Sequence, residues 1–116
     1  MNKQRRKTLA DIATRVDALK GVAILSFDEL KKIQPMLLTA VSEIESVQED
    51  EEEAFDNKPE ALQEQAQDAY DSFVDNVENA INLLNSLGDL TDIEYDANDV
   101  EGDFDGIADY LNDAQD

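Results

Sequence analysis

The feature that most constrains the fold is the spacing of apolar residues between Pro59 and Gly88. These residues recur at intervals of three or four, close to the 3.5-residue period of helices that pack against other helices. Proline suits a first helical turn, and glycine just past the last apolar position is a common terminator. The pattern predicts a long helix over residues 60–87, with an apolar seam of Leu62, Ala66, Ala69, Phe73, Val77, Ala80, Leu84 and Leu87.

A second apolar pattern precedes this helix. Ser26 and Glu29 have the spacing of a capping box, which predicts a helix start at Ser26. Pro35 removes a backbone donor and disfavours helix in the residue before it, so we expect a kink or a break there. The more regular helix runs from Pro35 to about Phe55. The turn sequence DNKP at 56–59 then predicts that the two long helices form an antiparallel hairpin.

The two ends of the chain differ in character. Residues 8–20 show the apolar spacing of one helix face, which Gly21 interrupts or ends. Packed on the hairpin, this segment gives a three-helix bundle over residues 1–88. Residues 89–116 carry eleven acids and no base, and form either a short docked helix around Phe104 or a disordered acidic tail. The predicted fold is therefore all-α, a helical bundle followed by an acidic C-terminal segment.

Charge restricts the partners. The formal net charge is -20, made of +4 over residues 1–32 and -24 over residues 33–116. This charge repels DNA and anionic membranes, so direct nucleic-acid binding and membrane binding are not expected. A basic protein surface is the natural counterpart. No apolar stretch is long enough to span a bilayer, and we expect a cytoplasmic protein.

The residue types argue against catalysis and metal binding. The chain has no histidine and no cysteine, which removes the usual general base and the thiolate ligand, so we expect neither an enzyme nor a cofactor. Residues 101–112 imitate the start of an EF-hand loop, with acids at Glu101, Asp103 and Asp105 and a glycine at Gly106. The twelfth place holds Asn112 instead of a bidentate glutamate. The expected outcome is weak attraction of Ca²⁺ without an ordered site.

The acidic sequence around residues 49–53 is the candidate binding site. On a helix, Glu45, Glu49, Glu52 and Asp56 fall at intervals of four and three, so their carboxylates form one row. Like charges at this spacing weaken a helix, which indicates a binding surface more than a structural device. A plain solvated acidic face is the alternative. The predicted partner-binding residues are Glu45, Ser46, Glu49, Asp50, Glu52, Glu53 and Asp56.

Two short motifs resemble known bacteriophage proteins. The stretch EEEAFDNKPEALQ at 51–63 resembles a motif of small helical phage proteins. Glu45-Ser46-Val47 is similar to the Glu-Ser-Ile/Val tripeptide of uracil-DNA glycosylase inhibitors, which imitate DNA. In that family the tripeptide meets the DNA-binding loops of the enzyme, although from a strand edge and not from a helix. The alternative is that Val47 is a core residue and Ser46 is incidental.

The resemblance implies a function and a pocket. It implies that Glu45 and Ser46 face the enzyme, and that an apolar pocket receives the leucine with which the glycosylase probes DNA. The residues expected to line this pocket are Leu38, Val41 and Leu84. The favoured function is inhibition of a basic DNA-binding host enzyme by DNA mimicry, in the host cytoplasm. The competing hypothesis is a structural module that forms a homodimer through the 60–87 helix.

Overall fold

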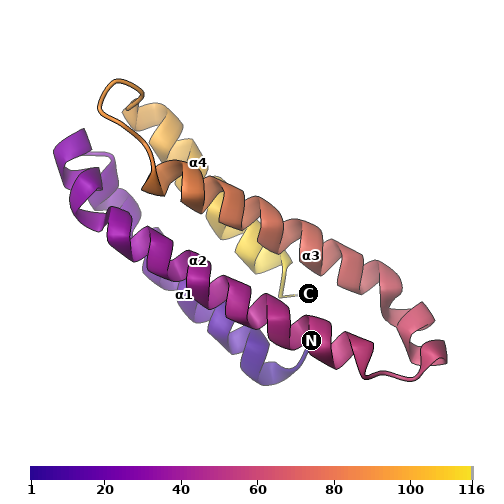
Figure 1. Ribbon diagram of the computed structural model, residues 1–116. Coiled ribbons are helices and arrows are strands. Elements are labelled where there is room, and N and C mark those ends of the chain that lie inside the picture. The colour runs from indigo at the N-terminus through magenta and orange to yellow at the C-terminus, as the bar shows by residue number, and fades with distance from the viewer. Residues whose placement is uncertain (116) are drawn as a thin grey trace.

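The computed structural model describes residues 1–115 and confirms the all-α prediction. It has four helices, whereas the predicted bundle had three. The fourth helix lies in the stretch after Gly88 and packs on the first and third helices. Figure 1 shows the four as long antiparallel rods. Their bounds are α1 Lys3–Ala23, α2 Phe27–Asp56, α3 Glu60–Gly88 and α4 Ala97–Asp113.

The helices form a ring in which each contacts two neighbours. α1 packs on α2 and α4, and α3 packs on the same two helices (Figure 1). Within residues 1–115, the backbones of α1 and α3 do not approach each other closely, so the two helices occupy one diagonal of the ring. The bundle is elongated, with extents of 51 × 20 × 18 Å. This arrangement is an up-down-up-down four-helix bundle with short connections.

The core lies along the common axis and contains only apolar side chains among residues 1–115. Every helix contributes to it, including α4, so residues 89–115 share one core with residues 1–88. Burial of these apolar faces is the main stabilising force. The largest fully buried side chains are Leu9, Ile12, Leu30, Leu37, Ile44, Val77, Leu84, Leu87, Val100, Phe104, Ile107 and Leu111.

α2 is continuous through Pro35, and the expected break is absent. The helix starts as predicted, because Ser26 Oγ accepts a hydrogen bond of 3.2 Å from the backbone N–H of Glu29. Pro35 is exposed and removes only one backbone bond from a helix of 30 residues. Ile33 and Leu37 are buried on either side of it, so tertiary packing holds the helix together across the proline.

Gly21 and Gly88 were both expected near helix ends, and only Gly88 ends a helix. α1 continues through Gly21 to Ala23, so this glycine does not end the helix. Gly88 is the last residue of α3 and has no positive φ, so it does not act as a left-handed cap. A Cβ at Gly88 would lie 2.6 Å from Leu38 Cδ2. A larger residue at this position would therefore force the partly exposed side chain of Leu38 to move.

The role of α4 in the core can be tested by Phe104→Ala. Phe104 is fully buried, and loss of such a side chain costs about 3–5 kcal/mol of unfolding free energy. Urea unfolding followed by circular dichroism measures this loss. Asn112→Ala, an exposed change on the same helix, should alter the unfolding free energy by less than about 0.5 kcal/mol. Equal, small effects of both changes would show that α4 is not part of the cooperative unit.

Candidate functional site

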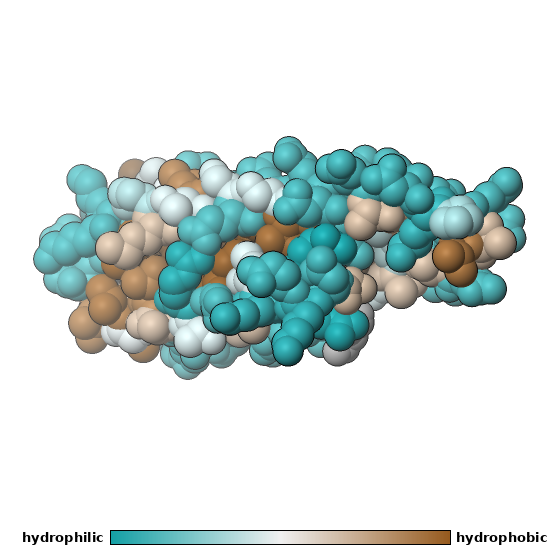
Figure 2. Space-filling view, turned by 90° about the horizontal axis from the view of Figure 1, so that it is seen from below, coloured by the Kyte–Doolittle hydropathy of each residue, from teal (hydrophilic) through white to brown (hydrophobic). Residues whose placement is uncertain are grey.

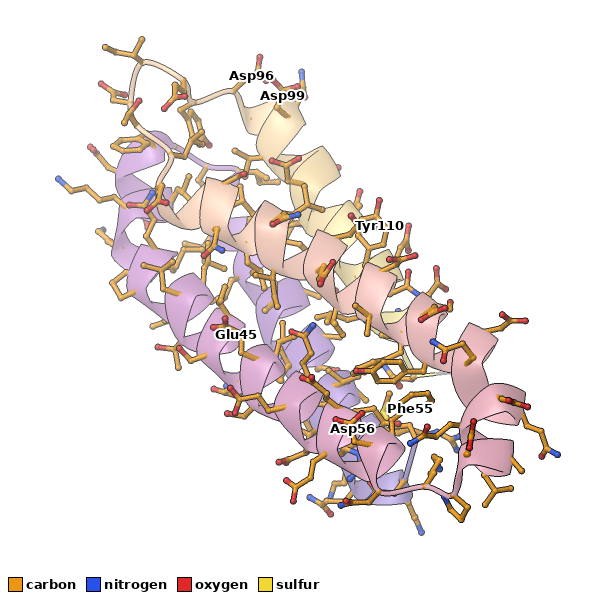
Figure 3. The ribbon with its side chains drawn as sticks, turned by 45° about the vertical axis from the view of Figure 1, so that its right-hand side comes forward. Glu45, Phe55, Asp56, Asp96, Asp99 and Tyr110 are labelled. Atoms are coloured by element: carbon orange, nitrogen blue, oxygen red, sulfur yellow. The ribbon has the colours of Figure 1, made fainter. Side chains whose placement is uncertain are left out.

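The predicted acid row lies on the flank of α2 that faces α3. Glu45, Glu49, Glu52 and Asp56 are all exposed, and Figure 3 shows Glu45 and Asp56 well separated along one helix. The row covers twelve residues of helix, and its ends are eleven residue steps apart, or roughly 16 Å at 1.5 Å per residue. Its carboxylates are therefore held at regular steps by a continuous helical backbone.

α3 adds further carboxylates to the same surface. A groove between α2 and α3 is lined by Gln48 and Glu52 from α2 and by Asp71, Asp75 and Glu78 from α3. The three α3 acids follow one another at intervals of four and three, as do the acids of α2. α3 contains no lysine and no arginine. We call the surface formed by Glu45, Glu49, Glu52, Asp56, Asp71, Asp75 and Glu78 the α2–α3 acidic face.

Tyr70 reports the charge at this face. Its ring stacks on Phe55, with ring centroids 4.2 Å apart and planes 11° apart. Burial raises the pKa of the Tyr70 phenol above its ordinary value, and the neighbouring carboxylates of Glu52, Asp56, Glu51 and Asp71 raise it further. These acids come from both helices, so the negative charges of α2 and α3 converge on one aromatic cluster.

Three cations of α1 form ion pairs with acids of α2 and α4. Arg5 Nε is 2.5 Å from Glu51 Oε2, and Arg15 pairs with Glu43 of α2 through both of its terminal nitrogens. Lys20 Nζ is 2.6 Å from Asp105 Oδ1 of α4. All three cations come from α1, which is diagonal to α3. The ring order of the helices therefore keeps Arg15 and Lys20 away from α3, whereas Lys58 stands in the turn between α2 and α3.

These pairs also shift the pKa of the groups that they join. The hydrogen bond to Arg15 lowers the pKa of Glu43, and the hydrogen bond to Asp105 raises the pKa of Lys20. A carboxyl group with a lowered pKa stabilises the fold above its unfolded pKa, and this contribution disappears as the pH falls through the folded pKa. Both pairs are partly exposed, so each contributes little at physiological salt.

All seven predicted partner-binding residues are exposed, but they form two rows. Ser46, Asp50 and Glu53 each follow a member of the first row by one residue, so their row is rotated by about 100° around α2. Glu51, in the middle of the acidic sequence, turns toward α1, where it pairs with Arg5 and with the amino terminus. Most acids of residues 49–53 are therefore exposed to solvent, whereas Glu51 is directed toward α1.

The apolar pocket expected from Leu38, Val41 and Leu84 requires correction. Leu84 is completely buried and Val41 is 8% exposed, so both are core residues and neither can receive a partner side chain. Leu38 is 40% exposed and lies over Gly88. The reason is the register of the bundle, which turns Val41 and Leu84 toward the common axis.

Residues 101–112, which imitate the start of an EF-hand, belong to α4 and form no loop. Their acids are distributed around a helix, and within residues 1–115 no cluster of three potential metal ligands forms. Burial raises the pKa of Asp103, and the charge of Asp99 raises it further. Among the same residues, no helix combines the length and apolar character needed to cross a bilayer.

The α3 acids were missed in the sequence. Asp71, Asp75 and Glu78 carry the same four- and three-residue spacing that identified the α2 row, and this signal lay beside the apolar seam of the same helix. Only the antiparallel packing of α2 and α3 brings these three acids to the groove that Glu52 of the α2 row also lines. Comparison of the chain with known protein families, with curated proteins and with solved structures gave no match.

The convergence of charge on Tyr70 gives a testable pH dependence. Glu52→Gln removes one of the nearby carboxylates, so the pKa of the Tyr70 phenol should fall toward its ordinary value of about 10. The measurement is an absorbance titration of the phenolate, compared with a Tyr70→Phe variant to isolate this residue. Because the folded state disfavours the phenolate, stability should also decline as the pH rises above the unfolded pKa.

Tyr95 provides the control for this titration. Burial and Asp96 raise its pKa, and Glu52 is not among the groups that act on it. Its titration should therefore be unchanged by Glu52→Gln. A Tyr70 titration that is insensitive to Glu52→Gln would show that the acids of α2 do not gather at this groove.

Proposed function

We propose that this protein inhibits a DNA-binding host enzyme by presenting the α2–α3 acidic face in place of DNA. The observation that carries the proposal is the segregation of charge. Two antiparallel helices bring acids to one groove, while Arg5, Arg15 and Lys20 of α1 pair with acids on the α1 side of α2 and on α4. A basic DNA-binding groove is the complementary surface, and such complementarity speeds encounter with a partner.

The spacing of the acids suits this role. The α2 row advances by about 5.5 Å per carboxylate at 1.5 Å per residue. Phosphates along one DNA strand rise about 3.4 Å each, or about 7 Å apart when the twist is included. The acids of α3 supply a second line of charge, as the second strand of a duplex does. The acidic face and DNA are therefore similar in the density of negative charge along a rod. Inhibition by this similarity requires no chemical reaction.

The scaffold supports the proposal energetically. Like charges three or four residues apart weaken a helix by about 0.2–0.5 kcal/mol per pair. The apolar core offsets this cost, and the carboxylates are fixed before the partner arrives. A preorganised surface loses less conformational entropy on binding than a flexible acidic tail does. Affinity for a basic groove should fall as salt rises, because both charged surfaces are exposed.

Uracil-DNA glycosylase is the proposed target, on the basis of the Glu45-Ser46-Val47 tripeptide and a proposed bacteriophage origin. Glu45 and Ser46 are exposed and available to a partner, whereas Val47 is buried in the core. With Val41 and Leu84 also buried, Leu38 is the one exposed residue of the proposed pocket. The acidic face, and not a leucine pocket, therefore has to provide the recognition.

The competing homodimer through the 60–87 helix gains no support from the packing. Phe73, Val77, Ala80, Leu84 and Leu87 are buried within the monomer against neighbouring helices. Only the first part of the seam remains outside the core, and it consists of one leucine and two alanines. A self-paired seam along the whole helix would require the bundle to open.

The proposal predicts that neutralising the α2 row weakens inhibition. The variant Glu45→Gln/Glu49→Gln/Glu52→Gln/Asp56→Asn removes four negative charges from the acidic face. Uracil excision by uracil-DNA glycosylase, measured at excess of this protein, should be blocked by the native chain. The variant should be at least about tenfold weaker, which corresponds to about 1.4 kcal/mol.

A matched control separates the acidic face from bulk charge. Asp99→Asn/Glu101→Gln/Asp109→Asn/Asp113→Asn removes the same charge from exposed positions of α4. This control should inhibit nearly as well as the native chain. Equal losses in both variants would show that only net charge matters. Unimpaired excision with the native chain would exclude this enzyme, and affinity capture that retains no DNA-binding protein would exclude DNA mimicry.

A further inference from the structure

The face formed by α1 and α2 carries an apolar groove outside the acidic site. The groove has a volume of about 360 Å³ and is lined chiefly by Ala18, Leu19, Met36, Thr39 and Ala40. Figure 2 views the molecule from this side and shows apolar residues gathered toward one end of the rod. Met36 is 56% exposed and Leu25, in the α1–α2 turn, is 71% exposed. The exposed side chains of Leu25 and Met36 are thus found on the same face as a groove lined partly by small residues.

One stripe of α2 along this groove is complementary to itself. Lys32, Met36, Thr39 and Glu43 follow at intervals of four, three and four, so they share one helix face. The pair Lys32 and Glu43 and the pair Met36 and Thr39 are both centred between residues 37 and 38. An identical stripe laid antiparallel therefore places each lysine over a glutamate and each methionine over a threonine. Self-complementarity of this kind is what a two-fold interface requires.

We propose that a second copy of this chain docks antiparallel on the α1–α2 face, with the two-fold axis passing between residues 37 and 38 of each α2. Met36 of each copy enters the groove of the other beside Thr39 and Ala40. Lys32 of each copy reaches Glu43 of the other, which keeps its pair with Arg15. Small residues in the groove allow the two helices to approach closely.

Charge identifies a second copy, and not a basic partner, as the occupant. Two chains of net charge -20 repel each other, so they can meet only where that repulsion is least. Eight of the nine cations lie in residues 1–32, which form α1 and the start of α2. Beside the groove, Arg15 pairs with Glu43 and Lys32 pairs with Glu29, so two cations offset part of the negative charge at this face. A basic partner is drawn instead to the α2–α3 acidic face.

The dimer leaves the acidic faces free. α2 turns the Met36 stripe toward the α1 side and the Glu45–Asp56 row toward the α3 side. Each copy in the dimer therefore presents its own acidic face outward. The inference depends on the α1–α2 groove alone and holds whether or not the acidic face imitates DNA.

Light scattering coupled to size exclusion tests the dimer. Measurements use chain concentrations up to about 1 mM, where a binding free energy of about −4 kcal/mol already populates the dimer. Salt of about 0.3 M shortens the Debye length below about 10 Å and reduces repulsion between copies. The native chain should approach twice its mass of 12.9 kDa. A native chain that stays at 12.9 kDa throughout overturns the proposal.

A matched pair of variants locates the interface. Met36→Lys places a cation at the centre of each face and should give a monomer with unchanged helix content by circular dichroism. Ile93→Lys adds the same charge at a position that is 97% exposed in the α3–α4 loop, and should remain a dimer. A Met36→Lys variant that dimerises as the native chain does would overturn the assignment to this groove.

Cross-linking tests the antiparallel geometry. The chain has no cysteine, so one introduced thiol is unique. Thr39→Cys lies close to the proposed two-fold axis and should give a covalent dimer in high yield with a short bis-maleimide reagent. Ile93→Cys lies far from the axis and should give little. Equal yields from the two variants would indicate random collision and would contradict the two-fold arrangement.

Discussion

The burial of one apolar face from each of four helices is the interaction on which the rest of the structure depends. The chain carries 29 acidic residues against nine basic ones, and like charges at this density oppose a compact state. Within residues 1–115 the core contains no polar side chain, so nothing inside the bundle competes with that burial. α4 is essential to this balance because Phe104, Ile107 and Leu111 close the fourth side of the core.

The order of the helices around the core determines where the charged residues lie on the surface. α1 carries most of the cations and lies diagonal to α3, which has none. Arg5, Arg15 and Lys20 pair with acids of α2 and α4, the two helices adjacent to α1. The acids of α3 and of the adjoining flank of α2 are thus left on one face. The proposed inhibitor surface and the proposed dimer surface are consequently different faces of the same helix α2.

The local spacing of residues in the sequence predicted where the helices lie better than it predicted which helices contact each other. The seam from Leu62 to Leu87 located α3, Ser26 located the start of α2, and the acids at 45, 49, 52 and 56 were correctly expected to share a row if helical. Pro35 suggested a break because local preference could not include the burial of Ile33 and Leu37 around it. The sequence could not decide whether residues 89–116 form a helix, because the few apolar residues there are separated by many acids. Only the packing of α1 and α3 shows where these apolar residues are buried. Arg5 and Glu51 are 46 residues apart, so no local spacing could reveal that pair.

The central claim is that helical scaffolding holds the carboxylates of α2 and α3 in fixed positions, where a partner can recognise them as a shape. Amide hydrogen exchange, followed residue by residue by NMR over 45–56 and 68–78, tests this claim most directly. The account predicts strong protection of these amides at neutral pH and low salt, despite the repulsion between the acids. Exchange at the rate of an unstructured peptide across either segment would contradict it.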